Sequence, residues 1–415
     1  MSLLGPGLVT GASDDDPSGI ATYSQVGAQF GYGMLWTMLF SYPLMAGIQE
    51  TSADIGRVTG HGIAGNLVRH YPRWLALSLV ATLVVANVIN IGADIGAMGA
   101  AVSLLVGGPA AIYAVLLAVA ALLLQVFVPY HLYVKGLKWL TLALFAYVGT
   151  VLVVHVDWAA ALRATLIPSI KFDAATITAL VAVLGTTISP YLFFWQASEE
   201  VEEEKLSVPD RPLKFAPEQA PAQLRRIKLD TYVGMGFSNL VAFFIILAVA
   251  ATLHANGITQ IETASQAAQA LKPVAGPLAS LLFTIGIVGT GMLAIPVLAG
   301  SAAYALGEAM GWRVGLERNP RQAWQFYCVI AASILVGLGL SLSKVDPIQA
   351  LFWTAVINGV TAGPIMILLM LMATNRKVMG EFCVGRTQRI LGWTATAVML
   401  LCIVSMVTLW ATSRQ

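Results

Sequence analysis

Long apolar stretches alternate with short polar connections along almost the whole 415-residue chain. A helix that spans a membrane needs about 20 mainly apolar residues. By that criterion the pattern predicts eleven spanning helices and an all-α integral membrane protein. The expected spans are 3–28, 33–56, 74–105, 108–129, 136–154, 174–199, 229–253, 277–309, 323–342, 348–373 and 389–411.

The composition supports a membrane protein. Apolar residues make up 58% of the chain, charged residues 11%, and the mean hydropathy is +0.78, whereas soluble domains carry roughly 25% charge. Three cysteines without close spacing predict neither a disulfide framework nor a thiolate metal site. The first residues lack a basic region and a cleavage signal, so we expect no signal peptide, and a short cytosolic tail could precede them.

The polar connections indicate an orientation in the cell membrane. With a cytoplasmic N-terminus, the inner connections hold 18 Lys and Arg residues and the outer ones 5. Basic residues favour the cytoplasmic side. We therefore expect a multi-pass plasma-membrane protein with an extracellular C-terminus and an odd number of spans.

The longest polar segment, 200–228, predicts a cytosolic loop rather than a second domain. It begins with the acidic run 199–204, which is followed by Lys205. Such a run is typical of a solvated helix end. The alternative is a vestibule that concentrates cations on the cytosolic side.

A second acidic run lies inside the first apolar stretch, where Asp14, Asp15 and Asp16 are followed by Pro17, Ser18 and Gly19. No Lys or Arg occurs before Arg57 to neutralise these carboxylates. Proline and glycine open a helix and free backbone carbonyls. Acids within a membrane indicate a functional site, and oxygen ligands without a counter-charge predict a cation site.

A matching interruption is expected in the sixth span, at residues 185–191. Pro17 and Pro190 are 173 positions apart, and each falls in the first helix of a five-helix half. This spacing is typical of inverted repeats whose broken helices meet at the membrane midplane. The halves would cover 1–154 and 172–373 of a single transmembrane domain. Ordinary helix kinks are expected at three other prolines, Pro43, Pro296 and Pro364.

Several segments together resemble one family, the NRAMP divalent-metal transporters. They are Gly5-Pro6-Gly7, Asp16-Pro17, the stretch from Gly31 to Trp36, the stretch from Gln49 through Arg57 to Gly60, and Ser189-Pro190. The resemblance is clear in the first six spans and weaker beyond them. It implies a LeuT-like fold of two inverted five-helix repeats with an added eleventh helix at 389–411, and a carrier rather than an enzyme.

The departures from the family pattern concern the metal ligands. The family's Asp-Pro-Gly-Asn motif is replaced by residues 16–19, which keep the aspartate and lose the asparagine. Its Met-Pro-His motif is replaced by Ser189, Pro190 and Tyr191, and its second histidine aligns with Gln196. The pattern is similar to a divergent, magnesium-transporting branch. Thioether sulfur favours softer ions, whereas Mg²⁺ prefers oxygen ligands and keeps several waters.

The resemblance implies the metal ligands. Asp16 would be the anionic ligand, Gly19 would act through its carbonyl or a water, and Thr186 would provide a carbonyl. Ser189 would provide a hydroxyl or a water contact. We add Asp15 as a second carboxylate, acting directly or through water.

Further residues are expected along the permeation path or at its gates. Asp14 would be a helix-end or vestibule charge, and Tyr191 would line the path. Gln49 matches a family glutamine and would serve a gate or helix packing. Asn358 lies near the position of a family side chain that closes on the ion, although an interhelical hydrogen bond explains it equally well. Asp94 is the remaining member of the family's acidic pair in the third span.

Two further acids, Glu50 and Asp54, are expected to be solvated or to lie at a helix end. None of the five histidines is expected in the middle of a span, so the group that usually titrates near neutral pH is missing. We therefore predict transport of Mg²⁺, with Mn²⁺ accepted, by alternating access without obligatory proton coupling. The transported ion is substrate, and no cofactor, nucleic acid or second subunit is expected.

Four alternatives remain open. The first is a proton-coupled Mn²⁺/Fe²⁺ symporter. The second is a sodium-coupled amino-acid carrier, whose carboxylate substrate Asp16 would repel. The third is a membrane metalloenzyme, which would need His or Cys ligands. The fourth is a channel, which broken helices in inverted repeats disfavour.

Overall fold

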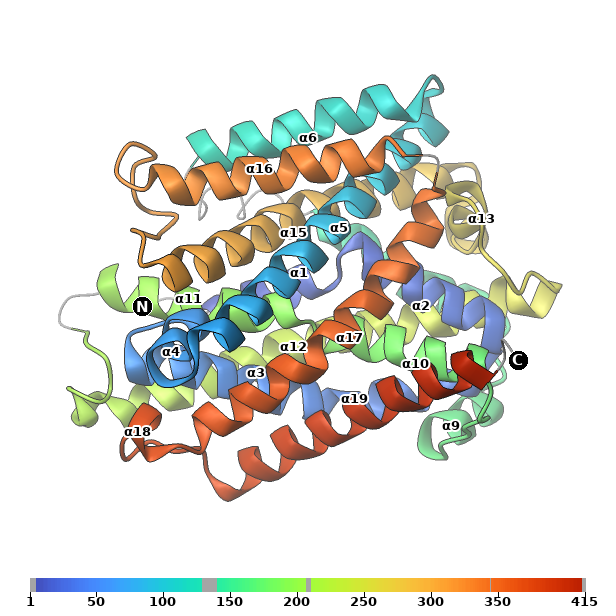
Figure 1. Cartoon of the computed structure of the whole chain (residues 1–415). Helices are drawn as coiled ribbons and strands as arrows, with labels where there is room; N and C mark the ends of the chain where they lie inside the picture. Colours follow the sequence, from blue (N-terminus) through green and yellow to red (C-terminus); the bar gives the residue numbers. More distant parts are fainter. Residues whose placement is uncertain (1–4, 129–139, 207–209, 344, 413–415) are drawn as a thin grey trace.

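The computed structural model describes residues 5–128, 140–206, 210–343 and 345–412. These residues form a bundle of long helices joined by short helices and loops (Figure 1). The helices are α1 (Pro6–Asp14), α2 (Pro17–Phe30), α3 (Trp36–Thr59), α4 (Ile63–His70), α5 (Arg73–Val106), α6 (Ala110–Phe127), α8 (Phe145–Val153), α9 (Trp158–Leu166), α10 (Ala174–Thr187), α11 (Pro190–Leu206), α12 (Ala220–Thr252), α13 (Ala264–Gln269), α14 (Lys272–Ala275), α15 (Ala279–Met310), α16 (Trp324–Ser341), α17 (Pro347–Ala373), α18 (Arg376–Met379) and α19 (Arg386–Thr412). The short 3₁₀ turns are η1 (Gly31–Met34), η2 (Leu140–Leu144), η3 (Pro217–Gln219), η4 (His254–Asn256) and η5 (Gly276–Leu278).

Helices occur in every one of the eleven predicted spans. Within the described part of the chain, eight helices are long and apolar enough to cross a membrane by length and composition. The first predicted span is divided into α1 and α2, and the sixth into α10 and α11. Residues 136–139 of the fifth span lie outside the described residues. The membrane character is therefore clear, and the number of crossings stays a prediction.

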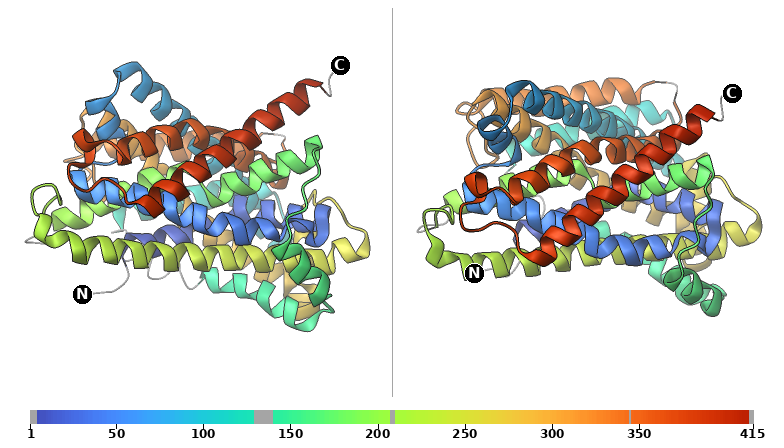
Figure 2. Two further views of the ribbon diagram at one scale, coloured as in Figure 1. Left: turned by 90° about the horizontal axis from the view of Figure 1, so that it is seen from below. Right: turned by 60° about the horizontal axis from the view of Figure 1, so that its bottom comes forward.

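The connections gather at two ends of the bundle. In Figure 1, α4 and α18 lie at one end, and α9 and α13 lie at the other. The first end carries the connections that the sequence assigns to the cytosol, and the second carries those assigned to the outside. Figure 2 shows α19 crossing the outside of the bundle at an oblique angle, where it contacts α3, α10 and α17.

Glycines bring several helix pairs into close contact. Gly11 of α1 faces the backbone of Gly234 on α12, and Gly185 of α10 faces Ala355 and Gly359 on α17. A side chain at any of these glycines would collide with the neighbouring backbone. Small residues at such crossings are how membrane helices approach each other closely. The contacts hold α1 and α10, the first half of each broken helix, against continuous helices.

The polar segment after α11 differs from the prediction. Helix α11 continues to Leu206 and α12 begins at Ala220, so the connection is shorter than the expected loop 200–228. Glu200 and Glu204 are 0% and 6% exposed, so a solvated helix end is wrong for these two acids. The reason is that the acidic turn packs against neighbouring helices, and Arg226 of α12 donates to Glu200 at 2.5 Å.

Glu50 and Asp54 are also buried, against expectation, with 5% and 7% exposure. Asp54 Oδ2 accepts a hydrogen bond from Gln388 Nε2 of α19 at 2.8 Å. The solvated role predicted for both acids is wrong because α19 contacts α3 along this stretch. Pro43, Pro296 and Pro364 lie inside the continuous helices α3, α15 and α17.

Candidate metal site at the two helix breaks

The first break lies between α1 and α2. Asp15 leaves the helical conformation with φ −82° and ψ 49°, and Asp16 is extended with φ −67° and ψ 169°. The extended form is the one favoured before proline, and Pro17 suits the first position of a helix. Asp16 also caps α2, because its Oδ1 accepts the Gly19 N–H at 2.7 Å. The local sequence therefore produces the break and fixes one oxygen of Asp16.

The second break separates α10 from α11 at Ile188 and Ser189. Ile188 has φ −121° and ψ 60°, and α11 begins at Pro190, whose ring excludes a continued helix. The Ser189 hydroxyl lies 2.8 Å from the carbonyl oxygen of Gly185 and 2.7 Å from that of Thr186. A hydroxyl carries one hydrogen, so it donates to one carbonyl at a time. The hydroxyl is thus within hydrogen-bond distance of the Thr186 carbonyl, which the family resemblance implies is a metal ligand.

The two breaks lie side by side. A Cβ at Gly19 would be 3.3 Å from the carbonyl oxygen of Asp14 and 3.4 Å from Thr186 Cγ2. The Tyr191 hydroxyl of α11 donates to the carbonyl of Ser13 at 3.2 Å. Because α1 and α10 both end here, their last carbonyls and the negative ends of their dipoles belong to this region. Such an arrangement favours a cation.

The three consecutive aspartates face different partners. Ser238 of α12 lies 2.6 Å from Asp14 Oδ2 and 3.0 Å from Asp15 Oδ1. Asp16 Oδ2 instead accepts a hydrogen bond from Asn90 Nδ2 of α5 at 2.9 Å. The structure thus groups Asp15 with Asp14 rather than with Asp16. A role for Asp15 at the ion stays a prediction, and a bridging water is the route that suits this arrangement.

The aspartates are buried without a counter-charge. Asp14, Asp15 and Asp16 are 1%, 3% and 2% exposed. Asp94 of α5 is fully buried, and neither of its carboxylate oxygens has a hydrogen-bond partner in the described part of the chain. Among the described residues, the ion pairs of the protein involve none of these four acids. Burying a carboxylate in this way is costly unless a cation or a proton joins it.

Asparagine and serine complete the surroundings of the aspartates, and the sequence analysis had assigned neither Asn90 nor Ser238 to the site. An amide in the middle of the long apolar helix α5 was the available signal for Asn90. Ser238 gave no comparable signal, because serines are common where membrane helices pack. Within the described ranges, no three His, Cys, Asp or Glu side chains converge to hold a metal ion. A metal ion bound among the described residues would therefore have at most two such side chains as ligands, together with neutral oxygens or waters.

The predicted gate residue Gln49 links three helices. Its Nε2 donates to the carbonyl of Leu192 at 2.9 Å and to Gln196 Oε1 at 2.7 Å. Gln196 Nε2 in turn donates to Thr231 Oγ1 at 2.7 Å. This chain joins α3, α11 and α12, and it includes the residue that aligns with the family's second histidine.

Asn358 lies on α17 and is 1% exposed, with its Oδ1 lacking a partner among the described residues. The next residue, Gly359, faces the backbone of Val181 on α10. Asn358 is therefore near the second break, and its closing on an ion stays a prediction.

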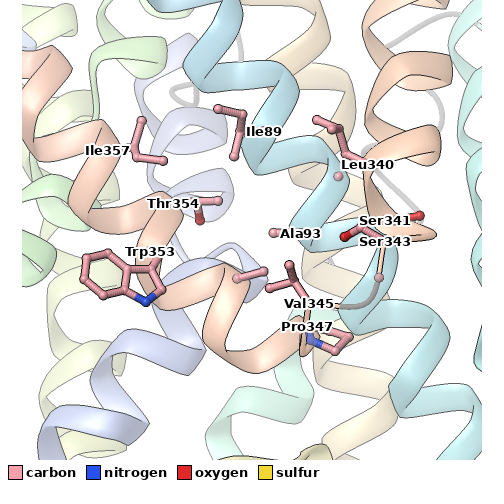
Figure 3. Close-up of a pocket in the computed structure, with 13 residues that line it drawn as sticks. Ile89, Ala93, Leu340, Ser341, Ser343, Val345, Pro347, Trp353, Thr354 and Ile357 are labelled. Carbon is pink, nitrogen blue, oxygen red and sulfur yellow. The ribbon is translucent and has the colours of Figure 1, made fainter.

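A cavity of about 270 Å³ lies between α5, α16 and α17 (Figure 3). Its lining is mainly apolar and includes Ala93, Leu340, Trp353 and Ile357. The described residues that line it include no carboxylate. Ala93 and Ile357 belong to the lining, whereas their neighbours Asp94 and Asn358 do not. The cavity is lined by Ile357, the residue before Asn358, and its mainly apolar lining lacks the charged oxygen ligands that a cation site needs.

Comparison with known structures defines the class. The fold matches a manganese transporter of Eremococcus coleocola, solved with an aromatic bis-isothiourea compound, with a TM-score of 0.75 and 17% identity over 98% of this chain and 86% of that one. It also matches Mhp1, a nucleobase-cation-symport-1 family transporter in a closed conformation, with a TM-score of 0.58 and 14% identity over 99% of this chain and 93% of that one. The protein thus has an all-helical membrane fold of the LeuT-like kind.

The family follows from sequence. The model described as natural resistance-associated macrophage protein-like matches residues 7–409, so the chain belongs to the Nramp family. Proteins named divalent metal cation transporter MntH are similar along nearly the whole length. That of Deinococcus radiodurans is 24% identical over 96% of this chain and 88% of its own. That of Klebsiella pneumoniae strain 342 is 26% identical over 96% of this chain and 92% of its own.

Proposed function

We propose that this Nramp transporter carries divalent metal ions into the cell by alternating access, with Mg²⁺ as its chief substrate and Mn²⁺ also accepted. One observation carries the choice of ion: the two breaks offer only oxygen donors. Residues 13–20 and 185–192 contain no Met, Cys or His. Asp16 provides a carboxylate, Thr186 a carbonyl and Ser189 a hydroxyl.

Such a donor set suits a hard ion. Mg²⁺ dehydrates reluctantly, keeps several waters and binds through one or two carboxylates. Softer ions gain from thioether or imidazole ligands, which the two breaks lack. Mn²⁺ also accepts oxygen ligands, so we expect it to compete with Mg²⁺.

The second candidate is a proton-coupled Mn²⁺ or Fe²⁺ symporter. The names of the relatives favour it more directly than they favour magnesium, because the MntH proteins are called divalent metal cation transporters and the structural match is a manganese transporter. The ligand residues of the breaks favour Mg²⁺ instead. This chain is only 24% and 26% identical to the two MntH proteins, and at such identities relatives can differ in the ion they prefer.

The proton question separates the two candidates. Histidines are absent from the middle of the described spans: His61 follows α3, His70 ends α4, His155 follows α8 and His254 lies in η4. His131 lies outside the described residues. The membrane potential alone provides about 2.3 kcal/mol per charge per 100 mV, or about 4.6 kcal/mol for a divalent ion. Uptake therefore needs no second ion.

We further propose that the protein acts as a monomer in the plasma membrane, with its N-terminus in the cytosol and its C-terminus outside. The clustering of basic connections at one end of the bundle supports this orientation. Protease protection of tagged termini in sealed cells tests it.

The deciding experiment measures Mg²⁺ uptake into proteoliposomes, with Mn²⁺ as competitor and a pH-sensitive dye inside. Saturable Mg²⁺ uptake that Asp16→Ala abolishes, without metal-dependent acidification, supports the magnesium carrier. Mn²⁺ uptake with acidification and without Mg²⁺ uptake overturns it in favour of the symporter.

A further inference from the structure

We propose that Asn90 is a positioning residue for the metal site: its amide orients the Asp16 carboxylate, and its carbonyl oxygen binds a water of the incoming ion. The inference rests on the proposed function, because it concerns the ion that Asp16 would bind. Asn90 lies on the continuous helix α5, so it brings a contact to the break from outside both broken helices.

Asp16 is held from two directions. Its Oδ1 accepts the Gly19 N–H at 2.7 Å, and its Oδ2 accepts Asn90 Nδ2 at 2.9 Å. The first contact belongs to the local cap of α2, and the second crosses to another helix. Two hydrogen bonds occupy about half of the lone pairs that a carboxylate offers. The carboxylate is therefore fixed in orientation while acceptor positions remain for a cation.

The carbonyl oxygen of the Asn90 side chain makes no hydrogen bond within the described ranges. A carboxylate requires a donor, so Nδ2 faces Asp16 and Oδ1 is the remaining atom. Asn90 is fully buried, and its Oδ1 has no partner among the described residues. Since the two terminal atoms of one amide are about 2.3 Å apart, Oδ1 lies within about 5 Å of Asp16 Oδ2. That span suits an ion bound to Asp16 at about 2.1 Å whose retained water donates to Oδ1.

Asn87 shows what a structural asparagine looks like on the same helix. It is one turn earlier and equally buried, and its Oδ1 also lacks a partner among the residues that the structure describes. Its Nδ2, however, donates to the carbonyl of Leu298 at 2.9 Å and to Ser301 Oγ at 2.7 Å, both on α15. A free Oδ1 therefore distinguishes nothing by itself. What sets Asn90 apart is that its donor binds a carboxylate with no counter-charge.

The pair provides a matched test in proteoliposomes. Asn90→Ala is compared with Asn87→Ala, and Asn90→Leu with Asn87→Leu, by measuring the KM and maximal rate of Mg²⁺ uptake. We expect Asn90→Ala to raise the KM about tenfold, since losing one hydrogen bond to a charged group costs about 1.4 kcal/mol or more. Asn90→Leu should raise it further, because leucine excludes the water that could replace the amide. The Asn87 variants should lower the amount of folded protein and leave the KM unchanged.

Equal KM values for the Asn90 and Asn87 variants would overturn the positioning role while uptake by the unsubstituted protein leaves the proposed function standing. An unsubstituted protein that takes up neither Mg²⁺ nor Mn²⁺ removes the proposed function, and the role of Asn90 with it. Should a leucine variant fail to fold, the alanine pair decides. As a second readout, Mg²⁺ should raise the melting temperature of Asn87→Ala as it does that of the unsubstituted protein, and raise that of Asn90→Ala less.

Discussion

Buried acidic side chains have different partners in two regions of the protein. At the far end of α11, Glu200 accepts from Arg226 at 2.5 Å, and the fully buried Arg57 of α3 donates to Asp210 at 2.7 Å. At the break between α1 and α2, Asp16 meets neutral donors only, and both oxygens of Asp94 lack partners among the described residues.

The difference distinguishes acids that are paired with an arginine and stabilise helix packing from acids that have no cationic partner in the protein. The negative charge of a buried carboxylate beside an arginine is already neutralised by the protein, so its role is in helix packing. Carboxylates without a protein cation are stable only if something else brings positive charge. For Asp16, the proposed function makes the transported ion that partner. The comparison therefore predicts that replacing Asp16 at the break changes transport, and that replacing Arg226 beside α11 changes stability.

The largest effect is expected for Asp16→Asn. Asparagine can still accept the Gly19 N–H, so the cap of α2 survives while the negative charge is lost. Losing a charged ligand should cost about 3 kcal/mol or more, which corresponds to at least about a 100-fold loss of Mg²⁺ uptake at low concentration. Uptake into proteoliposomes measures it.

Asp54→Asn is the matched control for that variant. Asp54 is also a buried aspartate, and its contact is the amide of Gln388. It should transport at close to the normal rate. Similar losses in both variants would mean that any buried acid matters to this fold, and the special status of the break would be lost.

The next effect is one of stability. Arg226→Leu leaves Glu200 with a side chain that is 0% exposed and lacks its ion-pair partner. Removing one member of a buried pair costs roughly 3–5 kcal/mol, so detergent-solubilised protein should unfold at a clearly lower temperature. The KM for Mg²⁺ should stay unchanged in the folded fraction. Adding Glu200→Leu should restore much of the lost stability, and a double variant as unstable as the single one would contradict the pairing.

Prediction from the sequence succeeded for features that depend on neighbouring residues. Apolar stretches predicted where helices lie, and Pro17 and Pro190 predicted both breaks, because these effects are local. It failed where distant residues decide. Asn90 is 74 positions from Asp16, and Ser238 is 224 positions from Asp14. No periodicity links such pairs, so only the folded chain brings them together.

The error at Glu200 has the same origin. A run of glutamates at a helix end is usually solvated, and the sequence could not show that Arg226 would return beside it on α12. The grouping of Asp15 with Asp14 was likewise invisible, since it depends on how Asp15 leaves the helix and on where α12 lies.

A smaller effect, on selectivity, is expected for Ser189→Met. The substitution introduces a thioether at the second break and removes the hydroxyl from the Thr186 carbonyl. Sulfur favours softer ions, so the preference for Mn²⁺ over Mg²⁺ should rise about tenfold, or about 1.4 kcal/mol. Ser189→Ala removes the hydroxyl without adding sulfur and separates the two causes. A shift equal in both variants would assign the change to the freed carbonyl rather than to the thioether.

The smallest effect is expected for Asp94→Asn. This variant tests whether a buried acid without an ion-pair partner must take part in transport. Asp94 is as buried as the acids of the break, and neither of its oxygens has a hydrogen-bond partner among the described residues. The proposed magnesium carrier nevertheless gives it no proton to carry. Metal uptake by this variant should stay within about twofold of normal, and no metal-dependent acidification should appear before or after the substitution. The coupled symporter predicts the opposite: acidification in the unsubstituted protein that Asp94→Asn removes. In that case Asp94 would bind the transported proton, and Asp16 would bind the metal ion.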